Sequence, residues 1–296
     1  MKRAMLIVVL VIITIALGVR VLGARGKELG TTLPASDGTL GASALSAPSQ
    51  QSQSSMAISA QGFARRNLHS MRLVSTPQID GNLADWPAGE SIELNRSTAF
   101  SFLGGIAGLN DLSAVIRSGW DENTLYFAIE VRDDVLVTDS TDVWRDDGVE
   151  MGLDGLYDRY AWGTDDHQYT VVADGRRTDR GVPTDSISAG VLTYGGGYNI
   201  EVAIPILQLI PGVPISGTVM GFTIGLHDDD DGGNWDAYLI WEGTTTGDLP
   251  EQFGNLIFSE RLEDRIAILE AKIVRLERRT QELLTILAEF EQMTPP

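Results

Sequence analysis

Short segments with alternating apolar and polar residues fill the chain from about residue 73 to residue 259. Other segments there are rich in β-branched and aromatic residues, and Gly, Asp and Asn separate them. This spacing, without a long helical pattern, predicts an all-β fold, an antiparallel, jelly-roll-like β-sandwich of roughly eight to ten strands. Glycines at 195–197 predict a hairpin turn. The clearest segments are residues 113–118, 124–132, 148–153, 168–173, 198–204, 221–226, 237–241 and 256–258.

Two other patterns precede this region. Lys2 and Arg3 come before an uncharged apolar run over residues 4–19. A basic start and an apolar run are typical of an export signal. We expect residues 1–23 to be an uncleaved signal anchor that tethers an exported domain to a membrane; secretion after signal cleavage is the alternative. Residues 24–70 are rich in Ser, Gly, Ala and Gln and predict a flexible linker.

Apolar residues recur in alternating steps of four and three near the C-terminal end, with charged residues between them. The repeat predicts a coiled coil over residues 261–293. Leu at the d positions and Ile at two a positions favour parallel dimers, whereas Thr280 and Leu287 at the other a positions leave a trimer open. A lone amphipathic helix packed onto the sandwich is the alternative. The repeat consists of Leu262, Ile266, Leu269, Ile273, Leu276, Thr280, Leu283, Leu287 and Phe290.

The distribution of charge along the chain limits which kinds of molecule could bind the predicted domain. The chain carries a net charge of −19, and residues 71–260 hold nine basic against thirty-two acidic residues. Such a domain repels phosphate backbones, so nucleic acid is not an expected partner. Neutral sugars, cations or cationic partners fit better, and a merely solubilising surface is the alternative. The absence of Cys excludes disulfides and thiolate metal sites.

Several motifs follow one another in a fixed order. The first is Pro-Gln-Ile-Asp-Gly at 77–81, with a Trp five residues later. In this order the motifs resemble the family 9 carbohydrate-binding modules, over about 185 residues. The resemblance implies a β-sandwich that binds a polysaccharide or glycan without catalysis. The later motifs are Trp-Asp-Glu-Asn-Thr-Leu-Tyr (120–126), Trp-Arg-Asp-Asp-Gly-Val-Glu (144–150), Asp-Asp-His-Gln-Tyr (165–169), Gly-Gly-Tyr-Asn-Ile-Glu-Val-Ala-Ile (196–204) and Phe-Gly-Asn-Leu (253–256).

The resemblance also implies a sugar site. Sugar-binding members hold a terminal ring between two tryptophans, because a pyranose has an apolar face that stacks on an aromatic ring, and polar side chains bind its hydroxyls. Trp144 matches the first tryptophan, and Glu150 and Gln168 match polar residues near the sugar. Trp162 and Trp235 are candidates for another aromatic surface, although the sequence places neither of them at the site.

The chain departs from the family pattern at two places. Residues 246–250 read Thr-Gly-Asp-Leu-Pro where the second tryptophan is expected, and Thr170 stands where an arginine is expected. Trp144 packed in the core or at a hinge, and Glu150 on a strand surface, are therefore open alternatives. A structural or protein-interaction sandwich without sugar binding also remains open.

Acidic residues gather in predicted loops and suggest calcium, which takes six to eight oxygen ligands. Family members carry structural calcium, so the resemblance points the same way. The loop at 227–236 is not an EF-hand, because His227 and Tyr238 occupy the first and last ligand positions. A solvated acidic turn is the alternative. The candidate ligands are Asp133, Asp134, Asp146, Asp229 and Asp231.

Enzyme classes find little support in the sequence. The three histidines show no metal-ligand spacing, and neither a nucleophile elbow nor a phosphate loop occurs. Haem binding is an alternative from another class, because relatives of this sandwich bind haem through Met or His, and Met151 and His167 lie on predicted strands. We expect a non-enzymatic, exported carbohydrate-binding module that self-associates through its C-terminal helix.

Overall fold

A computed structural model describes residues 65–160 and 162–293. The predicted signal anchor (1–23) and nearly all of the predicted linker (24–70) lie outside these residues. The described part contains a 14-stranded sheet and the helix α2 (Leu262–Met293). The strands are β1 (Asn67–Arg72), β2 (Ile92–Leu94), β3 (Ser101–Leu103), β4 (Leu112–Trp120), β5 (Thr124–Asp133), β6 (Gly148–Asp154), β7 (Asp166–Val172), β8 (Arg177–Asp179), β9 (Val182–Pro183), β10 (Ser188–Tyr194), β11 (Gly197–Pro205), β12 (Val219–Asp228), β13 (Ala237–Ile240) and β14 (Gly254–Ser259).

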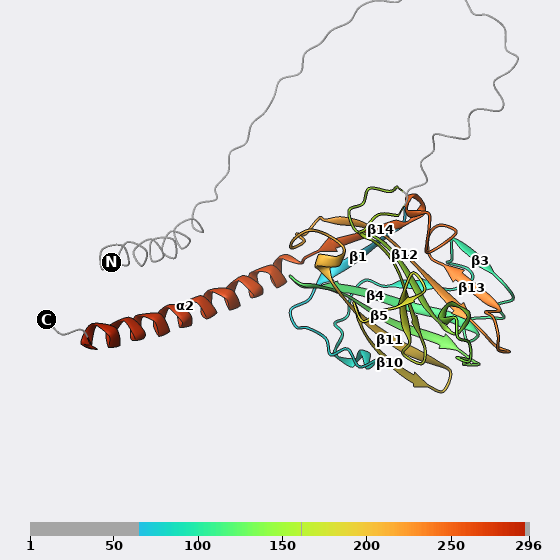
Figure 1. The fold of residues 1–296 in the computed structure, drawn as a ribbon, viewed down its shortest axis with the longest axis horizontal. Coiled ribbons are helices and arrows are strands. Elements are labelled where there is room, and N and C mark those ends of the chain that lie inside the picture. Colours follow the sequence, from blue (N-terminus) through green and yellow to red (C-terminus); the bar gives the residue numbers. More distant parts are fainter. Residues whose placement is uncertain (1–64, 161, 294–296) are drawn as a thin grey trace, which may run out of the picture. The chain divides into compact units, whose positions relative to one another are not determined.

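Eleven of the fourteen strands follow one path of hydrogen bonds that curls into facing layers (Figure 1), while β2 pairs with β4, and β13 pairs with β12 and β3. The path runs β10-β11-β5-β4-β1 and continues β14-β12-β6-β7-β8-β9. β1 joins the two halves, since it pairs in parallel with both β4 and β14. The other strand pairs are antiparallel. The mostly-β, curled sheet agrees with the predicted sandwich; the strands beyond the predicted eight to ten include the short β2, β3, β8 and β9.

Aromatic residues from the two halves meet in the core. Phe127 of β5 stacks on Phe222 of β12 with ring centroids 5.1 Å apart and planes at 15°. Trp120 of β4 meets Phe258 of β14 edge-on at 5.4 Å. All four side chains are fully buried, so the two halves face each other across one apolar interior.

Strict alternation along β6 and β7 separates the core from the outer face. Val149, Met151 and Leu153 of β6 point into the core, whereas the two residues between them are Glu150 and Gly152. Gly152 has no side chain, so the backbone of Thr246 can approach β6 closely; a Cβ on Gly152 would lie 2.2 Å from the carbonyl oxygen of Thr246. The functional site described below lies on this outer face.

Two segments refine the predicted boundaries. β1 begins at Asn67, so residues 67–70 belong to the sheet and not to the predicted linker. Leu68 and Ser70 point inward and are fully buried, and a strand with only one strongly apolar inward residue is hard to recognise. The predicted glycine hairpin is confirmed between β10 and β11, where Gly197 has φ 144° and a Cβ there would lie 2.1 Å from the carbonyl oxygen of Val131.

The helix α2 has 32 residues and begins one residue after the start of the coiled coil predicted over residues 261–293. No helix within residues 65–160 and 162–293 is long and apolar enough to cross a membrane.

Candidate functional site

Three hydrogen-bond donors fix the carboxylate of Glu150 on the outer face of β6. Gln168 Nε2 donates to Glu150 Oε1 over 2.6 Å, and Thr170 Oγ1 donates to Glu150 Oε2 over 3.3 Å. The hydroxyl of Thr246 also donates to this carboxylate. The strand register brings Glu150 close to these donors, because Glu150 lies opposite Thr170 and Gly152 lies opposite Gln168. Glu150 is buried and held in one orientation.

A histidine and a tyrosine border Glu150 on its other side. Gly225 of β12 lies opposite Glu150, and His227 lies opposite Tyr238 of β13. His227 Nε2 is 3.8 Å from Glu150 Oε2, and the His227 ring meets the Tyr238 ring edge-on at 4.6 Å. Burial lowers the pKa of His227, and the charge of Glu150 opposes this only in part. The imidazole is therefore neutral at pH 7.

These groups line a cleft of about 460 Å³. Trp144, on the short 3₁₀ turn η2 (Val143–Arg145), lines the cleft and is 39% exposed, so it is not a core residue. Trp235, in the loop between β12 and β13, lines the same cleft, and its ring centroid is 6.1 Å from that of Tyr238. The cleft thus combines two tryptophans with polar groups. Its lining consists of Trp144, Glu150, Gln168, Thr170, Thr178, Arg180, Gly181, His227, Trp235, Tyr238 and Thr245.

An arginine enters the cleft from the turn between β8 and β9. The guanidinium of Arg180 lies 4.4 Å over the Trp162 ring, and its Nη2 is 3.4 Å from Asp248 Oδ1. Trp162 Nε1 donates to the same oxygen of Asp248 over 2.6 Å. Trp162 therefore supports Arg180 and is absent from the cleft lining. Arg180 thus supplies a guanidinium from this turn, whereas Thr170 of β7 stands at the position where an arginine is expected.

The structure brings Trp144, Glu150 and Gln168 together, as the resemblance implied. Trp162, proposed as a further sugar-binding surface, lies behind Arg180. Sequence reasoning gave no site role to His227 and could not place Trp235. Strict alternation along β12 was the available signal, because it puts His227 on the outer face together with Gly225.

The residues considered for haem have other partners. Met151 is fully buried in the core. His167 Nδ1 lies 2.7 Å from Asp179 Oδ2, and His167 Nε2 lies 3.3 Å from the carbonyl oxygen of Gln208. Both imidazole nitrogens are thus engaged, and neither residue offers a free axial ligand.

Three buried aspartates form a cluster at one end of β5, β6 and β12. Oxygens of Asp133, Asp147 and Asp228 lie within 4.8 Å of one another, and all three residues are at most 2% exposed. Asp133 Oδ2 and Asp228 Oδ1 have no hydrogen-bond partner among the described residues. Burial and neighbouring carboxylates raise the pKa of Asp133 to about 9 and that of Asp228 to about 8. The cluster fits a cation such as Ca²⁺, whose charge and coordination would satisfy these orphan oxygens.

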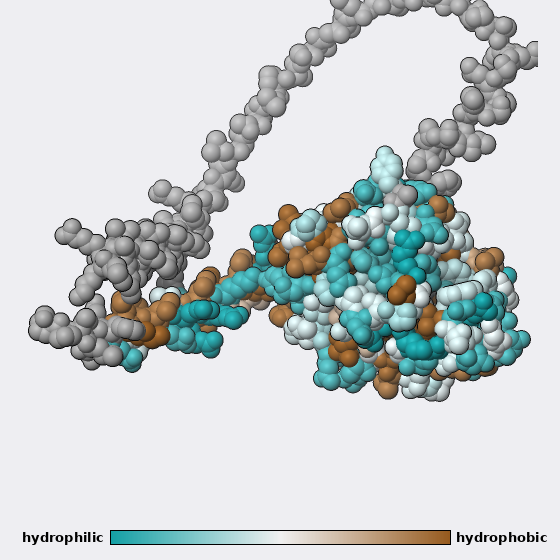
Figure 2. Space-filling view, in the orientation of Figure 1, coloured by the Kyte–Doolittle hydropathy of each residue, from teal (hydrophilic) through white to brown (hydrophobic). Residues whose placement is uncertain are grey.

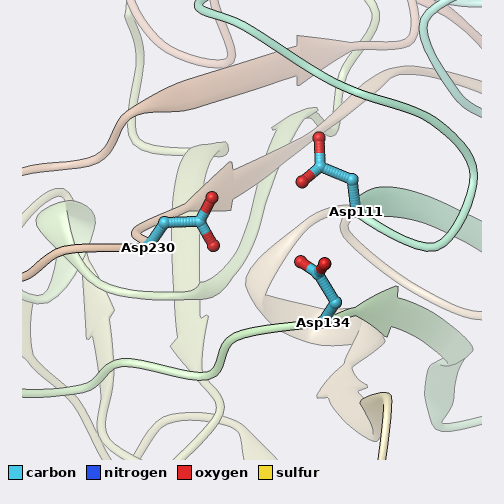
Figure 3. Close-up of side chains that lie close together, drawn as sticks. All are labelled: Asp111, Asp134 and Asp230. Carbon is cyan, nitrogen blue, oxygen red and sulfur yellow. The ribbon is translucent and has the colours of Figure 1, made fainter.

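The other predicted calcium ligands fall into neighbouring clusters. Asp134 lies with Asp111 and Asp230, and the three carboxylates face a common space (Figure 3). β5 ends at Asp133, which is buried, and Asp134 is exposed in the loop that follows.

Asp229 links two further groups of carboxylates, one with Asp139 and Asp146 and one with Asp231 and Asp236. Arg176 Nη2 donates to Asp146 Oδ2 over 2.5 Å, so the positive charge of the Arg176 guanidinium already neutralises Asp146. The five predicted ligands therefore do not form one site.

A family model described as carbohydrate family 9 binding domain-like matches residues 79–261. The chain belongs to this family. The family 9 match covers more than half of the chain and includes the cleft and the buried aspartates.

Relatives and solved structures agree with this assignment. Endo-1,4-beta-xylanase A of Thermotoga neapolitana is 30% identical over 191 residues, which are 61% of this chain and 17% of that protein. Exoglucanase XynX of Acetivibrio thermocellus is 28% identical over 194 residues, 63% of this chain and 17% of that protein. The chain thus spans about a sixth of these relatives, which are far longer proteins.

Two solved structures share the fold. A family 9 module from Caldicellulosiruptor kristjanssonii in complex with cellotriose has a TM-score of 0.57 and 23% identity, covering 67% of this chain and 96% of that one. The same kind of module in complex with glucose has a TM-score of 0.57 and 24% identity, covering 66% and 97%.

Proposed function

We propose that this family 9 domain binds carbohydrate in the cleft that Trp144, Glu150 and Trp235 line. The observation that carries the proposal is the combination of two tryptophans with a fixed carboxylate in one cleft of about 460 Å³. Such a cleft offers aromatic faces to an apolar sugar face and acceptors to its hydroxyls. Family membership and the sugars bound in the solved relatives support it.

The polar groups have distinct roles in this proposal. Glu150 already accepts three hydrogen bonds, and a carboxylate has about four lone-pair sites, so it can accept one sugar hydroxyl. Gln168 Nε2 is used by Glu150, which leaves its Oε1 as an acceptor. Arg180 donates from the turn between β8 and β9, while the neutral His227 adds no charge. The cleft is thereby preorganised for an uncharged sugar.

Titration calorimetry of the full chain with glucose, cellotriose and xylotriose tests the proposal, in a detergent without a sugar headgroup. Trp144→Ala should weaken binding about tenfold, because an aromatic stacking contact is worth about 1 kcal/mol beyond its buried area. Tyr160, which is 76% exposed and outside the cleft lining, provides a matched control, and Tyr160→Ala should bind as the parent does. A folded chain that binds none of the sugars would favour a structural role instead.

Calcium is part of the same proposal, as a structural ion held by Asp133, Asp147 and Asp228. The ion would supply positive charge to the orphan oxygens at the ends of β5 and β12. β12 leads directly into the loop that carries Trp235, and the backbone NH of Asp229 donates to Asp147 Oδ1 over 2.8 Å. An ion that orders this end of β12 would therefore also reduce the motion of the loop that carries Trp235 at one side of the cleft.

The remaining parts of the proposal concern the whole chain. We expect it to be exported and tethered by residues 1–23, to self-associate through α2, and to have no catalytic activity. Protease treatment of intact cells should remove the domain while the N-terminal segment stays with the membrane fraction. Release of reducing ends from xylan or cellulose by the purified chain would refute the non-catalytic assignment.

A further inference from the structure

The apolar stripe of α2 lies on a side of the helix that the sandwich leaves open. Ile266, Leu269, Ile273, Leu276 and Leu283 are each between 45% and 64% exposed. Figure 2 shows apolar side chains along α2 beside hydrophilic ones. Leucine and isoleucine side chains at heptad spacing remain exposed along a helix of 32 residues, so little of their apolar surface is buried within the chain. Such a stripe indicates that the helix packs against another molecule.

The sandwich contacts a different side of the same helix. Lys272 Nζ donates to Glu122 Oε1 over 2.6 Å. Ala267, Ile268 and Ala271 of α2 line a groove of about 310 Å³ together with sandwich residues. With Ile266 at position a, these three residues occupy positions b, c and f. Leu269, at a d position, also lines a second groove of about 350 Å³ that contains sandwich residues, and it stays 50% exposed. The other exposed residues of the stripe line neither groove, so the sandwich leaves most of the a and d positions open.

Charge on the two flanks of the stripe is segregated. The g positions, which precede each a position, carry basic side chains through most of the helix, and the e positions, which follow each d position, carry acidic ones. The basic g residues are Arg265, Lys272 and Arg279, and the acidic e residues are Glu263, Glu270 and Glu277.

This segregation favours one orientation of paired helices. In a parallel pair a g residue faces the e residue of the next heptad on the partner, so Arg265 faces a Glu270 and Lys272 faces a Glu277. In an antiparallel pair g faces g and e faces e, which brings like charges together. We propose that α2 pairs with α2 of a second copy of this chain in a parallel, in-register coiled coil specified by these g–e pairs. The inference rests on the proposed self-association and adds the register and the charged pairs that fix the parallel orientation.

The contact of Lys272 with Glu122 of its own chain is compatible with this pairing. A lysine ammonium has three donors, so Lys272 can contact Glu122 of its own sandwich and a glutamate of the partner. Because β14 ends at Ser259 and α2 begins at Leu262, parallel pairing holds two sandwiches at the same end of the coiled coil. Two clefts then reach one glycan surface, which raises the effective affinity of weak sites.

Sedimentation equilibrium of the full chain at low salt tests the orientation. In the double variant Glu270→Lys with Glu277→Lys, four attractive contacts of a parallel pair become repulsive, and the dimer dissociation constant should rise about 30-fold or more. Glu282→Lys with Glu289→Lys makes the same change of charge at two c positions and should leave the dissociation constant within about twofold. In an antiparallel pair, the first variant only exchanges one like-charge contact for another.

A cross-link gives an independent readout. The chain has no cysteine, so Leu283→Cys introduces a single thiol at a d position near one end of the helix. Oxidation should give a disulfide-linked dimer if the helices are parallel and in register. An associated chain that neither cross-links at position 283 nor responds to the charge exchange would overturn the proposed orientation, while a monomer would overturn self-association as well. Calorimetry with a soluble sugar is independent of both results and reports on the cleft alone.

Discussion

Replacing the buried Asp133 with asparagine should stabilise the domain without calcium and destabilise it when calcium is present. Asp133, Asp147 and Asp228 place carboxylates within 4.8 Å of one another in the interior, with an orphan oxygen on Asp133. Asp133→Asn replaces the carboxyl at almost constant volume. Without a cation the variant should melt at a higher temperature than the parent at pH 7, because the folded parent holds a proton on Asp133, whose pKa is raised to about 9, and the unfolded chain releases it, which favours unfolding. With calcium the variant should melt lower, because a ligand is gone.

The size of the calcium effect follows from mass action. A site with a dissociation constant of about 10 µM, within the range for protein calcium sites, gains about 2.7 kcal/mol from 1 mM calcium. For a domain of about 190 residues this corresponds to a rise of about 5–10 °C in melting temperature. The variant should show less than about half of this rise, since it lacks one of three carboxylates.

Thermal unfolding followed by near-ultraviolet circular dichroism, in 1 mM calcium and in a chelator, measures both effects. Asp142→Asn, at the exposed ion pair with Arg145, is the matched control and should keep the full calcium response. Equal melting of the parent in calcium and in chelator, or an Asp133→Asn variant that is destabilised equally in both, would refute the reasoning.

Three further substitutions test the cleft and the core. Thr246→Val removes a donor to the buried carboxylate of Glu150 and should weaken cellotriose binding about 5- to 30-fold in calorimetry, while it lowers the free energy of unfolding by about 1–3 kcal/mol; an unchanged affinity would show that this hydroxyl does not matter. Arg180→Met should weaken binding by a similar factor if its guanidinium donates to the sugar, and tight binding by this variant would exclude that role. Phe222→Ala removes the ring stacked on Phe127 and should lower the free energy of unfolding by about 3–5 kcal/mol in urea titrations; a loss below about 1 kcal/mol would contradict the central place of this pair in the core.

The part of the fold that alternation encodes could be predicted from the sequence. Residues of β6 alternate between Val149, Met151 and Leu153 inside and small or polar residues outside, and such strands were recognised. β1 was missed over residues 67–70, because its apolar inward position at Leu68 is flanked by polar residues and its pairing partners lie far along the chain.

The strand residues of the candidate site could also be predicted from the sequence, whereas its loop residues could not. Glu150 and Gln168 belong to neighbouring strands, so a motif and a register suffice to bring them together. Trp235 and Arg180 reach the cleft from loops, and the path of a loop over a sheet depends on tertiary contacts that no local pattern records. Trp162 illustrates the converse, since an aromatic side chain near the motif turned out to pack under Arg180.

The cleft over β6, β7 and β12 is the proposed binding site for the sugar. A crystal structure of the protein with cellotriose would test this site. We expect a glucose ring in van der Waals contact with the face of Trp144, and one of its hydroxyls within hydrogen-bond distance of Glu150. Sugar density on another face of the sandwich, with the cleft filled only by water, would show that the cleft is not the binding site.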